Sequence, residues 1–282
     1  PSIGPLVPDG GKSRWRRLTW ALVVTVCAAA AVAAEVYREV HTTRLVTETT
    51  VTDKLAGELR IMQLSDIHMR DDPAQLASIV TQVRDAGPHL IVIAGDTLNT
   101  RNETLDPLKD LFSRLSELGI PMYAVLGNHD HWSKDLPQLV ELYARHGIKL
   151  IDNEHEVITG KFGSFTLVGA GDAYTDHAHL DQALKGAPEG FRFLLTHSPE
   201  ILPQLEKADI DYAVCGHTHG GQVAMPFVGA IYVPGQGLFP KYSRGRYQAG
   251  RATLYIDSGI GVSGMELRLL VQSQIVLHVF RP

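Results

Sequence analysis

Cysteine is scarce in this sequence of 282 residues. Only Cys27 and Cys215 are present, which excludes a disulfide-stapled scaffold and a cysteine-rich zinc module. Cys215 ends an apolar run, so we expect it to be a small buried side chain rather than a nucleophile or a metal ligand. Any chemistry must therefore come from other side chains.

Positive charge is not in excess either. The chain has 26 Lys and Arg against 31 Asp and Glu, a formal net charge of −5. Tight binding to nucleic acid needs a basic surface, so we expect no nucleic-acid partner, and a nuclease is disfavoured. The 44% hydrophobic and 20% charged residues are typical of a globular protein with one large domain or two small ones.

Charged residues are missing from one long run near the N-terminus, Leu18 to Ala34. Its length is at the lower end of the roughly 17–25 residues that a membrane-spanning helix needs. By the positive-inside rule, residues 1–17 stay in the cytoplasm and the rest is exported. The basic residues that precede the run are Lys12, Arg14, Arg16 and Arg17.

Several interpretations of this run remain open. It is either an uncleaved membrane anchor at residues 18–34 or a signal peptide cleaved near Ala31-Val32-Ala33, after which the protein is exported. A twin-arginine signal at Arg16-Arg17 and a buried core helix are weaker alternatives. We expect residues 35–56 to be a connector that carries an early strand, and residues 57–282 to form the main domain outside the cytoplasm.

The main domain alternates strand and helix patterns. Helical spacing of apolar residues predicts helices over 73–86, 105–118 and 136–146, each followed by glycine. Alternation of this kind indicates an α/β domain with largely parallel strands, and closer strand spacing in the second half indicates a mixed or second sheet. Apolar runs of strand length lie at 59–64, 90–94, 122–126, 165–170, 191–196, 212–215, 253–256 and 275–280.

Five of these predicted strands end in side chains that commonly bind metals. Each fragment alone is typical of a turn, but the occurrence of all five at the ends of predicted strands is not explained by turns. The carboxyl ends of strands in an open α/β sheet meet at one edge, so these side chains should converge. Carboxylate and amide oxygens mixed with imidazole suit Mn, Fe or Zn rather than Ca or Cu(I). The fragments are Asp66-Ile67-His68, Gly95-Asp96, Gly127-Asn128-His129-Asp130, His197 and Gly216-His217-Thr218-His219.

This set of motifs resembles the calcineurin-like metallophosphoesterase superfamily, over roughly residues 59–280. The run from Gly216 to Gln222 and the N-terminal apolar segment further resemble its bacterial branch of membrane-associated or exported phosphodiesterases. The resemblance implies a four-layer α/β/β/α sandwich that follows the N-terminal helix.

The resemblance also implies a centre of two divalent or transition metal ions, with Mn favoured over Fe or Zn. A water between the metals would be acidified to hydroxide and attack phosphorus. His129 would be the catalytic side chain that protonates the leaving oxygen or stabilises the phosphoryl group. Asp130 and Asp172 could orient ligand imidazoles. The implied ligands are Asp66, His68 and His219 on one metal, Asn128, His197 and His217 on the other, and Asp96 between them.

The implied activity is hydrolysis of phosphoesters, most often phosphodiesters, in a small-molecule or phospholipid-type substrate. The membrane segment favours an alternative, a lipid-directed pyrophosphatase that resembles UDP-2,3-diacylglucosamine hydrolases. A catalytically silent metal-binding adaptor is a further alternative, against which the presence of His129 argues. The basic stretch from Lys241 to Arg251 either binds a second phosphate or is a solvated loop, and the sequence leaves the oligomeric state open.

Overall fold

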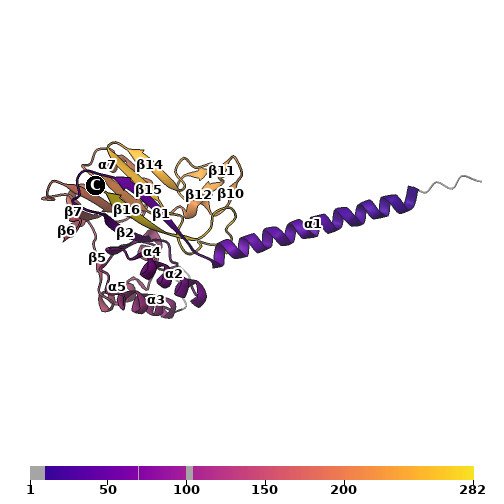
Figure 1. Cartoon of the computed structure of the whole chain (residues 1–282), viewed down its shortest axis with the longest axis horizontal. Coiled ribbons are helices and arrows are strands. Elements are labelled where there is room, and N and C mark those ends of the chain that lie inside the picture. Colours follow the sequence, from indigo (N-terminus) through magenta and orange to yellow (C-terminus); the bar gives the residue numbers. More distant parts are fainter. Residues whose placement is uncertain (1–9, 69, 100–103) are drawn as a thin grey trace, which may run out of the picture.

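The protein is a sandwich of two six-stranded sheets with helices on both outer faces (Figure 1). The computed structural model describes residues 10–68, 70–99 and 104–282. Residues 1–9 of the predicted cytoplasmic segment lie outside this description. The four layers confirm the predicted α/β/β/α architecture.

The first sheet has the order β1-β16-β2-β3-β4-β5. Strands β2 to β5 are parallel, whereas β16 is antiparallel to β2. The predicted connector contributes the edge strand β1, which pairs in parallel with β16. The strands are β1 (Arg44–Val51), β2 (Leu59–Leu64), β3 (Leu90–Ala94), β4 (Met122–Val125), β5 (Ile148–Leu150) and β16 (Gln274–Arg281).

The second sheet has the order β14-β15-β9-β8-β7-β6. Its four central strands are parallel and its two edge strands are antiparallel. All eight predicted strands are present, with ends within two residues of the prediction. The strands are β6 (Glu154–Gly160), β7 (Gly163–Gly169), β8 (Phe191–Leu195), β9 (Tyr212–Cys215), β14 (Gly245–Ala249) and β15 (Ala252–Ile256).

Three apolar layers hold the sandwich together. One lies between the first sheet and helices α2 (Pro73–Ala86), α3 (Asp106–Ser116) and α5 (Leu136–Arg145). A second lies between the two sheets. The third packs α6 (Leu180–Ala183) and α7 (Leu202–Leu205) on the second sheet and includes Cys215, which is buried as expected.

Local sequence explains the ends of the best-defined helix, α2. The Asp72 side chain accepts a hydrogen bond from the Gln75 amide at 3.1 Å, and Pro73 occupies the first helical position. Gly87 ends the helix in the left-handed conformation, at φ 54°. These are the cap residues that helix termini favour, so α2 begins and ends where the sequence predicts.

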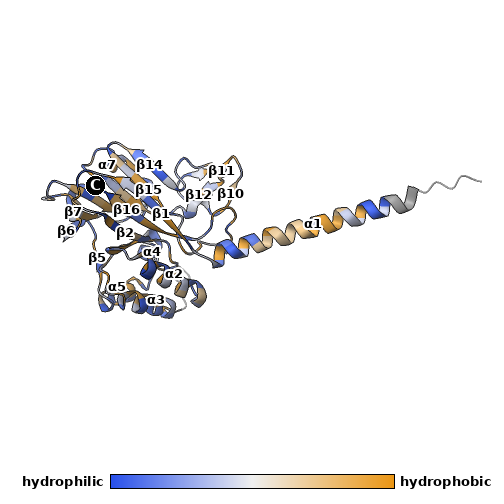
Figure 2. Ribbon diagram, viewed as in Figure 1, coloured by the Kyte–Doolittle hydropathy of each residue, from blue (hydrophilic) through white to orange (hydrophobic). Residues whose placement is uncertain are grey.

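Helix α1 (Gly10–His41) projects from the body (Figure 1), and Figure 2 shows its apolar middle portion. The stretch from Arg14 to His41 is long and apolar enough to cross a membrane, a test that a signal sequence would also pass. Its base is part of the body, because Glu39 and Val40 are buried. The Val271 amide donates to Glu39 Oε2 at 3.1 Å, which fixes the base of α1 to the body.

His278, on the central strand β16, should make folding stability depend on pH. It is fully buried between the sheets, where Nδ1 lies 3.1 Å from the Tyr212 hydroxyl and Nε2 lies 2.9 Å from Gln63 Oε1. Burial, with a smaller contribution from Arg246, lowers the pKa of His278 from 6.5 to about 3. The neighbouring ionisable groups on the second sheet are Tyr212, Tyr255 and Arg246.

Between pH 6.5 and 3 the unfolded chain therefore binds a proton at His278 that the folded chain does not. The contribution of His278 to stability is complete above pH 6.5 and falls as the pH decreases, by about 1.4 kcal/mol per pH unit. His278→Gln should reduce the pH slope of the free energy of unfolding by about this amount, measured by urea denaturation between pH 4 and 7. His146→Gln, at the partly exposed end of α5, is the control. An unchanged slope in His278→Gln would contradict the assignment.

Candidate metal centre

The eight predicted site residues lie together at the carboxyl ends of five strands. Residues after β2, β3 and β4 come from the first sheet, and residues after β8 and β9 come from the second. The two sheets thus face each other across the site. All of the side chains are buried except His129, which is partly exposed: Asp66, His68, Asp96, Asn128, His129, His197, His217 and His219.

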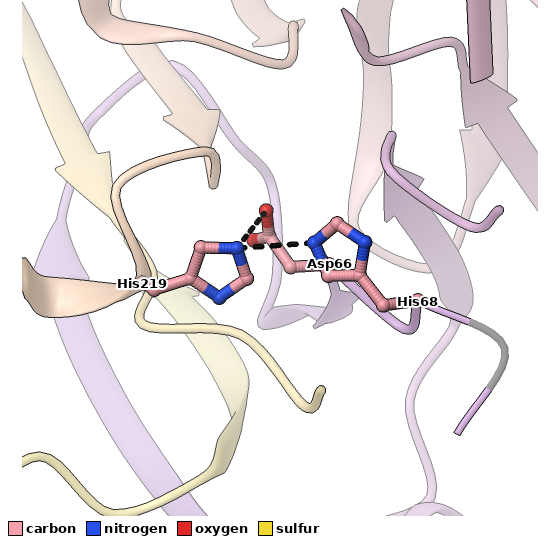
Figure 3. Close-up of side chains that lie close together, drawn as sticks. All are labelled: Asp66, His68 and His219. Atoms are coloured by element: carbon pink, nitrogen blue, oxygen red, sulfur yellow. Dashed lines mark hydrogen bonds and ion pairs between the residues drawn. The ribbon is translucent and has the colours of Figure 1, made fainter. Parts of the chain in front are cut away.

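The first cluster contains Asp66, His68 and His219 (Figure 3). His68 Nε2 and His219 Nε2 are 3.0 Å apart, and His219 Nε2 is 3.8 Å from Asp66 Oδ1. Three ligand-type atoms thus converge from loops 151 residues apart in sequence. This is the trio that the family resemblance assigns to one metal.

The second cluster contains Asn128, His197 and His217. Asn128 Oδ1 is 2.8 Å from His217 Nδ1 and 3.1 Å from His197 Nε2. Asp96 lies between the clusters, because its Oδ2 is 3.7 Å from His68 Nε2 and its Oδ1 is 3.4 Å from His197 Nε2. One carboxylate therefore faces both groups of ligands.

His129 stands at the mouth of this arrangement. Its ring packs edge-on against His68, with ring centroids 4.8 Å apart, and its Nε2 is 3.5 Å from the Ser263 hydroxyl. His129 Nδ1 is buried and has no hydrogen-bond partner among the described residues. A third grouping of ligand-type atoms joins His129 to His68 and Asp96. A cavity of about 80 Å³ adjoins it, lined in part by Trp132, Tyr174 and Pro234.

The backbone at the site is strained. Five of the eight residues have positive φ, a conformation that costs about 1–3 kcal/mol for a residue other than glycine and concentrates at functional sites. Glycines allow the close approach: a Cβ at Gly127 would overlap the Asp96 carboxylate, and one at Gly216 would overlap that of Asp66. The five residues are Asp66, His68, Asp96, His217 and His219, with φ between 48° and 69°.

Backbone carbonyls orient the imidazoles, which corrects the expectation for Asp130 and Asp172. His197 Nδ1 is 2.8 Å from Ala94 O, and His68 Nδ1 is 3.2 Å from Leu98 O. Asp130 instead accepts from the amides of Leu98 and Gly127 at 2.7 and 2.9 Å. Asp130 thus contacts the backbone of Leu98, the residue whose carbonyl lies next to His68 Nδ1.

Asp172 likewise orders a loop. It accepts from the Tyr174 and Thr175 amides, at 3.1 and 3.0 Å, and from the Thr175 hydroxyl at 2.7 Å. Tyr174 lines the cavity next to His217, with ring centroids 4.8 Å apart. Within the described residues, the carboxylates of Asp130 and Asp172 hydrogen-bond to amides and a hydroxyl rather than to the site imidazoles. A sequence does not show which amides a turn presents.

The electrostatics of the site suit divalent cations. Burial raises the pKa of Asp66 to about 7. Burial alone would also raise the pKa of Asp96, but His197 and its neighbouring histidines lower it overall. Burial lowers the pKa values of His68 and His217 to about 4, so both are neutral at pH 7, the form in which imidazole binds metals.

One buried nitrogen atom without a hydrogen-bond partner also indicates a metal environment. His217 Nε2 is buried and makes no hydrogen bond within the part of the chain that the structure describes. Buried polar atoms rarely lack a partner, and one such atom beside mixed carboxylate, amide and imidazole donors is suited to a metal environment. The residues present therefore fit divalent metal ions.

Arg268 is a residue that sequence analysis missed. Its guanidinium is fully buried and donates to Ser258 O at 2.7 Å, Gly259 O at 3.1 Å and also Gly261 O. Its Nη2 also lies 3.5 Å from His219 Nδ1. Arg268 thus holds the loop behind His219. Its acceptors are backbone carbonyls, which carry no sequence signal.

Most cations of the basic stretch from Lys241 to Arg251 contact other parts of the protein. Arg246 pairs with Glu48 at 2.8 Å, and Arg251 pairs with Asp211 at 2.8 Å and with Asp209. The Arg244 guanidinium donates to Leu270 O. Three of the four cations thus make structural contacts, and Lys241 stays exposed with its ammonium 4.8 Å from the centre of the Tyr242 ring.

Comparison with known protein families agrees with the geometry of the site. A family model described as calcineurin-like phosphoesterase matches residues 59–221, more than half of the chain. The chain belongs to this family. It is a hydrolase that acts on phosphoesters, in a family whose members use divalent metals.

Curated relatives agree with this assignment. The chain is 26% identical over 225 residues to YkoQ, a metallophosphoesterase of Bacillus subtilis, covering 78% of this chain and 83% of YkoQ. It is 29% identical over 227 residues to the phosphodiesterase YaeI of Escherichia coli, covering 79% and 82%. It is also 29% identical over 243 residues to a Danio rerio transmembrane protein with a metallophosphoesterase domain, covering 79% of this chain and 53% of that protein.

Proposed function

We propose that this phosphoesterase hydrolyses phosphodiesters at a centre of two metal ions. The observation that carries the proposal is the position of Asp96, whose two oxygens face two separate groups of ligand-type atoms. Asp66, His68 and His219 would hold one ion, and Asn128, His197 and His217 the other. The mixed oxygen and imidazole donors suit Mn, Fe or Zn, and we favour Mn.

The protein side of the mechanism follows from the contacts. Two bound divalent cations would neutralise charge on a phosphoryl group and lower the pKa of a water molecule. Asp96 lies between the two groups of ligand-type atoms. Its Oδ1 accepts a hydrogen bond from the His129 amide at 2.8 Å, which orients His129. The imidazole of His129 then reaches the cavity, where it could donate a proton to a leaving oxygen or a hydrogen bond to the phosphoryl group.

The name of one relative supports a diester as substrate, since YaeI is a phosphodiesterase. The test is a hydrolysis screen of the full chain in detergent with Mn²⁺, comparing bis-nitrophenyl phosphate, nitrophenyl phosphate, a nucleoside diphosphate lipid and nucleic acid. The full chain is needed because Glu39, Val40 and Thr43 are buried in the body. We expect the diester to be cleaved fastest. Preference for the diphosphate lipid would favour a lipid-directed pyrophosphatase, and no hydrolysis by metal-loaded protein would favour a silent adaptor.

We also propose that α1 anchors the protein in the cell membrane. Residues 1–17 would lie in the cytoplasm, residues 18–34 would span the bilayer, and the phosphoesterase domain over residues 57–282 would lie outside the cytoplasm. The positively charged side chains that precede the apolar run support this orientation.

A reporter fusion tests the orientation. A fluorescent protein that matures only in the cytoplasm, fused after Pro282, should stay dark in the membrane fraction, whereas alkaline phosphatase at the same point should be active. A bright fluorescent fusion in washed membranes would reverse the proposed topology. Recovery of the alkaline phosphatase fusion in the soluble exported fraction would instead indicate cleavage near Ala33.

A further inference from the structure

The segment that follows the 216–222 motif presents an unusual apolar surface. From Val223 to Pro240 the chain has no charged side chain. This stretch forms the hairpin of β10 (Ala224–Met225) with β11 (Gly229–Ala230) and that of β12 (Tyr232–Val233) with β13 (Gly237–Leu238). We call its exposed large side chains, with one from a nearby loop, the apolar face: Met225, Phe227, Val228, Leu238, Phe239 and Met265.

These side chains are too exposed for an ordinary surface. Phe227 is fully exposed, and Met265 and Leu238 are 74% and 68% exposed. The hairpins are joined to each other, because the Ile231 amide donates to Val223 O at 3.1 Å and the Phe239 amide to Ile231 O at 2.8 Å. Clusters of large exposed apolar side chains mark contact with another protein or with a membrane.

Strands β10, β11 and β12 of the two hairpins lie on the side of the body from which α1 extends (Figure 1). A short, hydrogen-bonded path joins them: the Ala224 amide donates to Leu269 O at 2.9 Å, and two residues later the Val271 amide donates to Glu39 of α1. The direction in which α1 leaves the body is thus tied to the position of the hairpins.

The length of α1 brings this side of the body close to the bilayer. The buried Glu39 lies five positions after Ala34, the last residue of the uncharged run. At 1.5 Å per helical residue the uncharged run ends roughly 8 Å from the body. Tyr37 lies in this interval and is 66% exposed, as is typical of aromatic side chains at a membrane–water interface.

We infer that the apolar face docks onto the lipid bilayer that α1 crosses, so that the body has two attachments to the membrane. Phenylalanine, leucine and methionine side chains suit the acyl-chain boundary, and the stretch from Val223 to Pro240 carries no charged side chain that would resist leaving water. Lys241 follows this stretch directly and is exposed, which suits anionic headgroups.

This docking brings the metal centre to the bilayer surface. Pro234, between the hairpin strands, lines the site cavity, as does Ser263. Ser263 also lines a groove of about 370 Å³, together with Tyr232, Met265 and Leu267. The groove lies between the apolar face and the site, so a substrate in the bilayer could reach the metals without leaving the membrane.

The test measures lipid contact at single labelled positions. The full chain carries Cys27→Ala, because Cys27 is exposed and Cys215 is buried. In this background Phe227→Cys or Leu238→Cys is labelled with an environment-sensitive nitrobenzoxadiazole dye, and the protein is placed in nanodiscs of phosphatidylcholine and phosphatidylglycerol. The control position is Val157, which is 48% exposed on the distant edge strand β6.

We expect doxyl-labelled lipids to quench the dye at positions 227 and 238 at least twofold more than at 157, and aqueous iodide to quench in the opposite order. Equal iodide quenching at all three positions, without doxyl quenching, would overturn the inference. Protection from iodide without doxyl quenching would also overturn it and indicate a protein partner, such as a second copy. The inference rests on α1 as an anchor, which fails separately if the protein does not enter nanodiscs.

Discussion

Replacing Asp96 with asparagine should deplete both metal positions and abolish most of the phosphoesterase activity. Among the residues that the structure describes, Asp96 is the one carboxylate within 4 Å of imidazoles from both clusters, His68 and His197. Asparagine keeps the size of the side chain but removes its charge and one of its two acceptor oxygens. Loss of an outer hydrogen-bonding partner costs a metal site roughly 10–100-fold in affinity, and loss of a shared ligand should cost more.

Elemental analysis of protein purified without chelator and then supplied with Mn²⁺ measures this effect. Wild type should retain transition metal after desalting, and Asp96→Asn should retain less than half as much, with a parallel loss of diester hydrolysis. Asp110→Asn, at an exposed carboxylate on α3 that pairs with Arg114, is the matched control and should change neither quantity. A wild-type protein that binds no transition metal would refute the two-metal proposal itself.

The convergence of the site was predictable because it depends on a rule of sheet topology. Asp66 and His217 are 151 residues apart, yet the Asp66 carboxylate accepts the His217 amide at 3.0 Å. Both follow buried strands whose carboxyl ends meet, and apolar runs locate such strands well. The helices on the outer faces were predictable for a similar reason, since their apolar spacing and their glycine stops are local.

The contacts that hold the site residues in place were not predictable from the sequence. Ala94 O and Leu98 O hold two imidazoles, but every residue has a carbonyl, and only the loop geometry aims these two. Arg268 is buried among carbonyls of a loop without any periodicity. The edge strand β6 contains only exposed and half-buried residues, without strict alternation and without an apolar run, so no strand pattern marks it.

The boundary between helix α1 and the body was also only partly predictable from the sequence. Residues 35–56 lack the apolar runs of a core strand, because β1 is an edge strand with one face exposed. Glu39 is charged and yet buried, since it accepts the Val271 amide. Charged residues are rarely buried unless paired, so a sequence places Glu39 in a connector, whereas the structure uses it to attach α1.

Replacing His129 with alanine should separate metal binding from turnover. His129 lies beside Asn128, a proposed ligand, but it is partly exposed and its Nδ1 has no hydrogen-bond partner in the described part of the chain. We therefore expect His129→Ala to keep its metal and most of its substrate affinity. Turnover should fall by roughly 10²–10⁴-fold, the usual contribution of general acid–base catalysis. His146→Ala is the matched control.

The leaving group then distinguishes two roles for this imidazole. If His129 donates a proton to the leaving oxygen, the loss should be much larger for a diester with an alkyl alkoxide leaving group than for one with nitrophenolate, which departs without a proton. Equal losses would indicate that His129 instead stabilises charge on the phosphoryl group. Loss of metal in His129→Ala would make His129 a ligand, as its grouping with His68 and Asp96 allows, and the proposed roles would have to be reassigned.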